Sequence, residues 1–426
     1  MNVRSNQRST KRDLLPLLVV GALSLIALAF WLFRAKPLPL PPPAIVHAPG
    51  PVAPPPPPQP VVFVAPNLTP ADLARAVPGA DGRLQLPHGN GTLQLTLDAK
   101  MQASLTAMLD KLAVPYAAIV LIDPKTGALI AAVEHREPGD PTGAIGSLTE
   151  PATPAASVFK VITAAALLDA GLTPESKECF RGGLHGIDAS HLRDIPGESH
   201  CETMTEALAH SSNAAFGKFA LHSLPLGNLT KMAEQFGFNH QIASDFKIAA
   251  SPMRDGVTNL ERGRTAPGFI GSSLSPLHAA WIAAALANGG QAMRPFAVAS
   301  DSTQAGLSAQ PSAQAQILPK EQALALGKMM EQTVLIGTGR HAFGARPAAL
   351  RDLAIAGKTG SLSGADPTVF RHFSWFVGFV PGEQRQVAVA VLAINGLKWR
   401  AKAATIARDA LAQYYAVGAQ TVAAHR

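Results

Sequence analysis

The stretch PAASVFKVITAAALLDAG, residues 154–171, is typical of a buried helix. Its apolar residues cover every face of the helix that the sequence predicts, and Gly171 marks the end. One residue is out of place, because Lys160 is the only charged residue of this stretch before Asp169. A lysine is rarely buried without a partner. Its position one helical turn after Ser157 therefore needs a chemical reason.

Ser157 and Lys160 are three residues apart, so a helix places them on one face. The backbone N–H groups at the start of the helix would point toward anything bonded to the serine oxygen. Burial among apolar residues favours a neutral amine, which can take the serine proton. Ser244 and Lys247 have the same spacing, but no apolar helix follows them. We interpret that second match as accidental.

Two further motifs have residue types that suit catalysis. HSSNAAF supplies Ser211 and Asn213 after a helix-like run, although a helix cap explains these two residues when they are taken alone. Lys-Thr-Gly at residues 358–360 continues an apolar strand, where lysine and glycine are both unfavourable. A glycine there indicates that another backbone approaches closely, and a cation beside it can hold a carboxylate. The second Lys-Thr-Gly, residues 125–127, lies between two apolar runs and is ordinary turn sequence.

The N-terminal part predicts a membrane anchor. Residues 1–36 hold six of the 36 lysines and arginines, and the rest of the chain carries 30 basic against 28 acidic groups. The net charge of +7 therefore does not indicate nucleic-acid binding. Residues 14–33 form a 20-residue apolar run, long enough for a transmembrane helix. Four basic residues precede it and two follow it, which predicts a cytoplasmic tail (residues 1–13) and an external remainder. A cleavable signal peptide is the alternative, but the run ends in FRAK, which suits cleavage poorly.

The globular domain is expected over residues 71–426, after a proline-rich linker at residues 34–70. Strand-like runs lie early, in the hairpin YAAIVLIDPKTGALIAAVEH, and late, in LAIAGKTGSL, FSWFVGFV and QVAVAVLAI. Residues 203–236 and 276–288 look mainly helical, and residues 401–416 predict a closing amphipathic helix. This order predicts an α/β (α+β) fold, in which helices and a helical subdomain flank an antiparallel sheet of about five strands.

Cys179 and Cys201 bracket a polar loop. An oxidising compartment favours a disulfide between them, which would contribute roughly 3 kcal/mol by closing the loop. The alternative is a metal site that combines the thiolates with His185, His191 or His200. The sequence does not support it, because these residues do not form two closely spaced pairs of ligands. We expect the disulfide, with no metal and no cofactor.

Ser-x-x-Lys on a helix, then Ser-x-Asn, then Lys-Thr-Gly on a strand resembles the motifs of penicillin-binding proteins and serine β-lactamases. The resemblance is strongest to penicillin-binding protein transpeptidase domains and runs from about residue 93 to residue 416. It extends to LTLDAKMQ, IDPKTGALIAAV, SPLHAAWIAAALANGG and SWFVGFVPG. It implies the penicillin-binding, β-lactamase-like fold.

The resemblance also implies a role for each residue of the first two motifs. Ser157 would be the acylated nucleophile and Lys160 its base. Ser211 would relay a proton to the departing amine. Asn213 would orient both the substrate amide and Lys160.

The third motif would bind the substrate. Lys358 would supply positive potential and, with Thr359 and Ser361, bind the terminal carboxylate beside Gly360. The backbone N–H groups of Ser157 and Ser361 would form the oxyanion hole. The chain departs from the family pattern at Ala156, where glycine is common, and at Ser361, where threonine is common.

The function implied by the resemblance is that of a peptidoglycan D,D-transpeptidase, which cross-links stem peptides through an acyl-enzyme at Ser157. Its expected partners are stem peptides, β-lactam antibiotics, the membrane and other cell-wall synthesis proteins. The expected location is the bacterial cytoplasmic membrane, with one span and the catalytic domain in the periplasm or extracytoplasmic space. The alternatives are a D,D-carboxypeptidase, a β-lactamase, and a low-activity envelope scaffold or β-lactam sensor. No distinctive acidic loop stands out between Asn213 and Lys358, which disfavours the β-lactamase.

Overall fold

The computed structural model describes residues 63–138, 146–184, 186–304, 306–366, 369–382 and 385–424. The predicted transmembrane helix at residues 14–33 and most of the predicted linker lie outside the described residues. Among the residues that are described, no helix is both long enough and apolar enough to cross a bilayer. Contacts with the domain begin before the predicted boundary at residue 71, because the backbone N–H of Leu68 donates to the carbonyl of Asp245.

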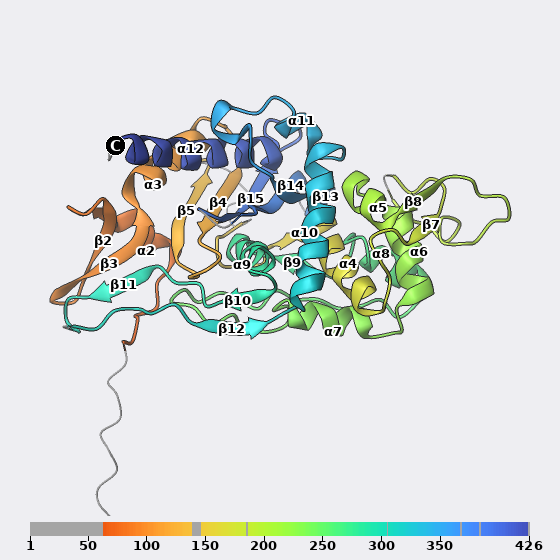
Figure 1. The fold of residues 1–426 in the computed structure, drawn as a ribbon, viewed down its shortest axis with the longest axis horizontal. Coiled ribbons are helices and arrows are strands. Elements are labelled where there is room, and N and C mark those ends of the chain that lie inside the picture. The colour runs from red at the N-terminus through yellow and green to blue at the C-terminus, as the bar shows by residue number, and fades with distance from the viewer. Residues whose placement is uncertain are drawn as a thin grey trace, which may run out of the picture. The chain divides into compact units, whose positions relative to one another are not determined.

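A five-stranded antiparallel sheet forms the centre of the domain (Figure 1). Its strands lie in the order β13 (Ala356–Asp366), β14 (Val369–Val380), β15 (Val387–Asn395), β4 (Tyr116–Ile122) and β5 (Leu129–Arg136). Three late strands therefore pair with two early ones, which confirms the predicted sheet. Strand β13 lies at one edge of this sheet.

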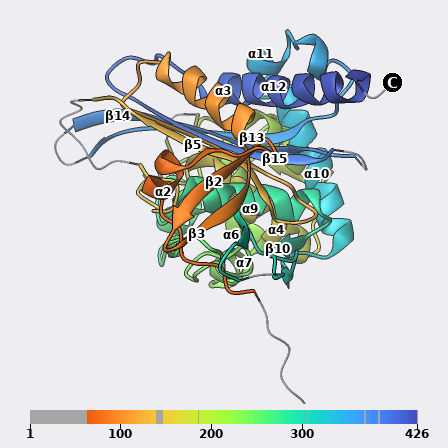
Figure 2. The same ribbon diagram turned by 90° about the vertical axis from the view of Figure 1, so that its left-hand side faces the viewer.

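Helices cover both faces of the sheet, which Figure 2 shows nearly edge-on. On one face lie α3 (Ala99–Asp110) and α12 (Ala403–Ala424), and on the other lie α9 (Pro276–Ala287) and α10 (Lys320–Leu335). Alternate residues of β4 join different cores: Val120 packs on the α9 side and Ile119 on the α3 and α12 side. Because both faces are buried, β4 is apolar along its whole length.

A mainly helical insert lies between β5 and β13. The predicted helix that contains Ser157 begins as a short 3₁₀ turn, η1 (Ala156–Phe159), before α4 (Lys160–Asp169). The region 203–236, predicted to be mainly helical, consists of three helices. Ser211 has a φ of +62° and ends the first of them, and the second stops before Pro225. These helices and the next one are α5 (Met204–His210), α6 (Asn213–Ser223), α7 (Asn228–Gln235) and α8 (Asn259–Thr265).

Smaller elements complete the domain. A four-stranded sheet packs at the N-terminal side, and short strand pairs and turns connect the larger elements. Their bounds are β1 (Val77–Pro78), β2 (Arg83–His88), β3 (Gly91–Asp98) and β11 (Val298–Asp301) for that sheet; β6 (Thr153–Pro154) with β9 (Ser273–Leu274), β7 (Lys177–Cys179) with β8 (Cys201–Thr203), and β10 (Gln291–Met293) with β12 (Ala313–Gln316) for the pairs; and α2 (Pro70–Arg75), α11 (Arg340–Phe343) and η2 (Ala348–Leu350) for the short helices.

Candidate active site

Ser157 lies at the turn that leads into α4. The residue before it, Ala156, has a φ of +47°, in the left-handed region that favours glycine. Gly268 packs against this turn so closely that a Cβ there would lie 2.0 Å from the Ala156 carbonyl oxygen. The turn is therefore held by its neighbours in a conformation that alanine rarely adopts.

Lys160 is fully buried and its amine has three polar neighbours. Its Nζ lies 2.8 Å from Ser157 Oγ, 2.7 Å from Asn213 Oδ1 and 3.1 Å from the carbonyl oxygen of Pro267. No carboxylate forms an ion pair with it among the residues that the structure describes. Burial, and then the positive charge of Lys358, hold the pKa of Lys160 well below its ordinary value. Both effects therefore favour the neutral amine.

The second motif lies where α5 ends and α6 begins. The left-handed conformation of Ser211 turns the chain so that its Oγ accepts a hydrogen bond from Lys358 Nζ, at 3.0 Å. Asn213 is the first residue of α6. Its Nδ2 donates to the carbonyls of Gly183 and Leu184 while its Oδ1 faces Lys160.

The third motif lies on the edge strand β13. Lys358 is fully buried, and burial lowers its pKa from 10.5 to about 7. Gly360 lies against the nucleophile turn: a Cβ there would be 3.2 Å from Val158 Cγ2 and 3.4 Å from the Val158 backbone nitrogen. The sequence predicts such a close approach of backbone, and the structure shows it. The hydroxyl of Thr359 is hydrogen-bonded to that of Thr338.

A cleft of about 690 Å³ joins the three motifs. Among the predicted residues it is lined by Ser157, Ser211, Asn213, Thr359 and Ser361. The structure thus brings all three motifs to one place, with the buried amines of Lys160 and Lys358 behind the residues that line the cleft. Within the described parts of the chain, no aspartate or glutamate lines this cleft.

Several residues of the site are absent from the sequence prediction. The carbonyls of Pro267, Gly183 and Leu184 bind motif side chains, and no residue type marks a carbonyl acceptor in a sequence. Other unpredicted residues line the cleft, and they include Phe269, Thr338, His341, Trp375 and Lys402.

The two accidental matches have other roles. Ser244 Oγ donates to the carbonyl of Pro295 at 2.8 Å, in a segment that is not helical. Residues 125–127 form the turn between β4 and β5, where the N–H of Gly127 donates to the carbonyl of Asp123. Neither match contributes to the cleft.

Cys179 and Cys201 are joined by a disulfide. Both sulfur atoms are therefore bonded, so the alternative metal site through their thiolates is not supported. Of the histidines considered for it, His185 lies outside the described residues. His191 is instead paired with Asp188, and His200 packs against Phe180.

Comparison with known proteins agrees with this geometry. Residues 117–412 match the family model described as the penicillin binding protein transpeptidase domain. The chain is 30% identical over 253 residues to the peptidoglycan D,D-transpeptidase PbpA of Mycolicibacterium smegmatis, a match that covers 57% of this chain and 50% of that protein. It is also 30% identical over 261 residues to PbpA of Mycobacterium tuberculosis, with the same coverage. The matches thus span about half the length of these curated relatives.

Solved structures of penicillin-binding proteins are also similar to this chain. The crystal structure of PBPA from M. tuberculosis matches with a TM-score of 0.62 and 25% identity, over 78% of this chain and 82% of that one. The imipenem acyl-enzyme complex of penicillin-binding protein A from M. tuberculosis matches with a TM-score of 0.64 and 26% identity, over 78% and 80%. The family model covers more than half of the chain and includes all three motifs. The chain therefore belongs to the penicillin-binding protein transpeptidase domain family.

Proposed function

We propose that the protein is a peptidoglycan D,D-transpeptidase that works through an acyl-enzyme at Ser157. The observation that carries the proposal is the set of three contacts at Lys160 Nζ. Asn213 Oδ1 and the Pro267 carbonyl can only accept hydrogen bonds. A neutral amine gives its two N–H groups to these acceptors, so its lone pair is directed at the hydroxyl of Ser157. Lys160 is thereby prepared to act as the base.

Acylation follows from this arrangement. Ser157 Oγ attacks the carbonyl between the two terminal D-alanines and gives its proton to Lys160 Nζ. The backbone N–H groups of Ser157 and Ser361 stabilise the oxyanion. The C–N bond then breaks: Ser211 gives its hydroxyl proton to the departing D-alanine amine and regains one from Lys358 Nζ, which donates to its Oγ, while Lys160 keeps the proton of Ser157. Lys358 and the hydroxyls of the third motif hold the terminal carboxylate, whose negative charge favours the ammonium form of Lys358.

In the second step an amine of a neighbouring stem peptide attacks the ester and releases Ser157. Transfer to water instead would make the protein a D,D-carboxypeptidase or, with penicillin, a β-lactamase. Rapid hydrolysis needs a base that activates water, and no carboxylate lines the described part of the cleft. Glu261 caps the start of α8 and Glu234 lies on the outer side of α7. The cleft therefore favours an acyl-enzyme ester that persists until an amine attacks it.

The proposal also includes location and partners. The apolar run at residues 14–33 and its flanking basic residues support a single-span anchor in the bacterial cytoplasmic membrane. The disulfide supports an oxidising compartment for the catalytic domain, the periplasm or extracytoplasmic space. Stem peptides and β-lactams are the proposed ligands. Other cell-wall synthesis proteins are proposed as partners in the membrane.

The test uses purified protein with a donor peptide that ends in D-alanyl-D-alanine and a peptide amine as acceptor. We expect mass spectrometry to find the cross-linked product with wild type and not with Ser157→Ala. We also expect the penicilloyl ester to persist for at least minutes. Hydrolysed donor alone would indicate the carboxypeptidase, and fast clearance of penicillin the β-lactamase. A stable ester without any product from the peptides would indicate the scaffold or sensor.

A further inference from the structure

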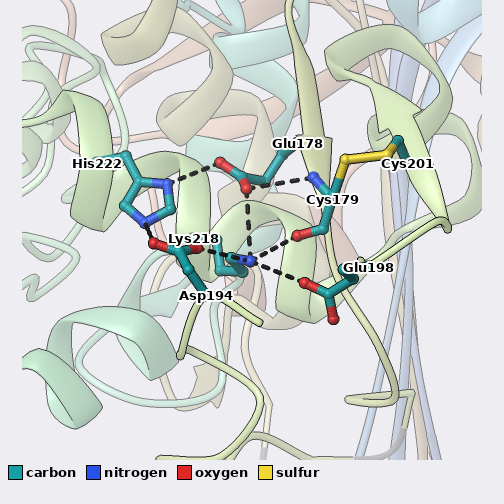
Figure 3. Close-up of polar contacts among 7 residues, drawn as sticks. All are labelled: Glu178, Cys179, Asp194, Glu198, Cys201, Lys218 and His222. Carbon is teal, nitrogen blue, oxygen red and sulfur yellow. Dashed lines mark hydrogen bonds and ion pairs between the residues drawn. A yellow bond between two sulfur atoms is a disulfide. The ribbon is translucent and has the colours of Figure 1, made fainter. Parts of the chain in front are cut away.

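Residues 180–200, here called the Cys loop, leave and rejoin the domain at the disulfide between Cys179 and Cys201 (Figure 3). These cysteines are directly opposite each other where β7 pairs with β8. The loop reaches the catalytic cleft, because Leu184 is one of the residues that line it. There the carbonyls of Gly183 and Leu184 accept hydrogen bonds from Asn213 Nδ2, at 3.2 and 3.0 Å.

These carbonyls decide which end of the Asn213 amide faces Lys160. A half-turn of an asparagine side chain exchanges its oxygen for its NH₂ group. Carbonyls can only accept, so they keep Nδ2 on the loop side and leave Oδ1 to face Lys160 Nζ. The reversed amide would present N–H groups to the lone pair that has to take the proton of Ser157. The Cys loop is therefore coupled to the base through Asn213.

A buried lysine on α6 binds the two arms of the Cys loop. Lys218 lies on the same helix as Asn213, and its side chain is 2% exposed. Its Nζ donates to the Cys179 carbonyl at 2.6 Å and to Glu198 at 3.1 Å, and it lies 3.0 Å from Asp194. In Figure 3 the ammonium lies between the start and the end of the loop, beside the disulfide.

The ammonium also balances charges that would otherwise repel. Glu178 lies 3.7 Å from Lys218 Nζ, so three carboxylates approach one cation. His222 bridges two of them, Glu178 and Asp194. Although burial opposes the charge, hydrogen bonds from Lys218 to Asp194 and Glu198 raise its pKa. These side chains could be taken for metal ligands, but Lys218 already supplies the positive charge among them.

Two further residues of the loop, Ile187 and Leu192, contact α6 and α8. Arg264 of α8 donates to the carbonyl of Ile187 at 2.7 Å, and Leu192 fits against Gly217 of α6 and Gly263 of α8. A Cβ at Gly217 would lie 2.8 Å from Leu192 Cδ2. The loop is thus seated on the helix that begins with Asn213.

We propose that Lys218 is a positioning residue for acylation: together with the disulfide, it holds the Cys loop so that the Gly183 and Leu184 carbonyls orient Asn213 toward Lys160. The inference rests on the proposed function, because it needs Lys160 to act as the base. It assigns a role in the reaction to a residue outside the three motifs. Without the ammonium, the carboxylates of Glu178, Asp194 and Glu198 face one another and drive the arms of the loop apart.

The experiment measures the second-order rate of acylation of the full-length protein by a fluorescent penicillin. We expect Lys218→Met to slow acylation at least tenfold, the effect of losing about one oriented hydrogen bond. Lys218→Arg keeps the charge and the donors and should stay within about threefold of wild type. The matched control is Leu105→Ala, which opens a cavity in α3 at the far side of the sheet and should leave the rate unchanged. Asp194→Asn, at an exposed position, removes the ion pair between Lys218 and one arm of the loop; it should slow acylation about fivefold and serves if Lys218→Met does not fold.

A double-mutant cycle separates positioning from a general loss of structure. If Lys218 acts through Asn213, then Lys218→Met slows wild type but causes no further slowing in an Asn213→Ala background. Equal slowing in both backgrounds would overturn the inference. A wild-type rate in Lys218→Met would overturn it too. If Lys218→Met does not fold, a wild-type rate in Asp194→Asn would do the same. A wild-type protein that is never acylated would instead overturn the proposed function, and this inference with it.

Discussion

Replacing Lys358 by methionine should stabilise the protein while it abolishes acylation. Lys358 is fully buried, and its pKa falls from 10.5 to about 7. That difference corresponds to roughly 5 kcal/mol against folding at pH 7, because the unfolded chain binds the proton more tightly. Methionine removes this cost and fills a similar volume. It also loses the hydrogen bonds to Ser211 Oγ and the Thr359 carbonyl, at about 1 kcal/mol each. The net gain should be about 3 kcal/mol at pH 7.

The stability gained by Lys358→Met should decrease as the pH rises above 7. Between pH 7 and pH 10.5 the unfolded lysine is protonated and the folded one is not, so the stability of wild type rises with pH by up to about 1.4 kcal/mol per pH unit. The variant lacks this contribution, and its advantage should fall to near zero at about pH 9. Urea unfolding of wild type and variant at pH 7 and pH 9 measures the gain in stability at each pH. Lys328→Met, at an exposed ion pair with Glu331, is the control and should show no such gain. A Lys358→Met variant that is less stable than wild type at pH 7 would refute the reasoning. A gain in the free energy of unfolding that is the same at pH 7 and pH 9 would refute it as well.

Three further predictions concern other buried or strained residues. Lys160→Arg should slow acylation by at least about 100-fold, because arginine stays charged and has no lone pair for the serine proton; near-normal labelling by a fluorescent penicillin would contradict the role of Lys160 as base. Ala156→Gly should raise the free energy of unfolding by about 0.5–1 kcal/mol, because Ala156 is held at a φ of +47°; a lower denaturation midpoint would count against this strain. Burial lowers the pKa of His278 from 6.5 to about 4, so stability is fully present above pH 6.5 and should fall by about 3 kcal/mol as the pH drops to 4. His278→Gln should lose most of this pH dependence, and an unchanged dependence would show that other groups cause it.

The central sheet could be predicted because its strands carry their own signal. Strands β4 and β15 are buried on both faces, so their sequences are apolar without a break. The smaller strands carry no such signal: β6 and β9 have two residues each and exist only because tertiary packing brings them together. Helix α10 was not predicted either. Its sequence contains Gly327, which lies against Phe379 and reads as a helix breaker when this contact is unknown.

The site could be predicted as far as side chains define it. A lysine in an apolar helix predicts Lys160, and Lys218 in NAAFGKFALHS carries the same signal. The carbonyls of Pro267, Gly183 and Leu184 could not be predicted, because a backbone acceptor has no sequence of its own. Only the fold places them beside Lys160 and Asn213.

The most direct test of the central claim is peptide mass mapping after the purified protein has reacted with penicillin. Three contacts at Lys160 Nζ direct its lone pair at Ser157. Ser211 also lies beside a buried lysine, because its Oγ accepts a hydrogen bond from Lys358 Nζ at 3.0 Å, so Ser211 is the serine from which Ser157 has to be distinguished. We predict one penicilloyl adduct, on the peptide that contains Ser157, and none in Ser157→Ala. An adduct on Ser211 or Ser244, or no adduct on wild type, would contradict the assignment of Ser157 as the nucleophile.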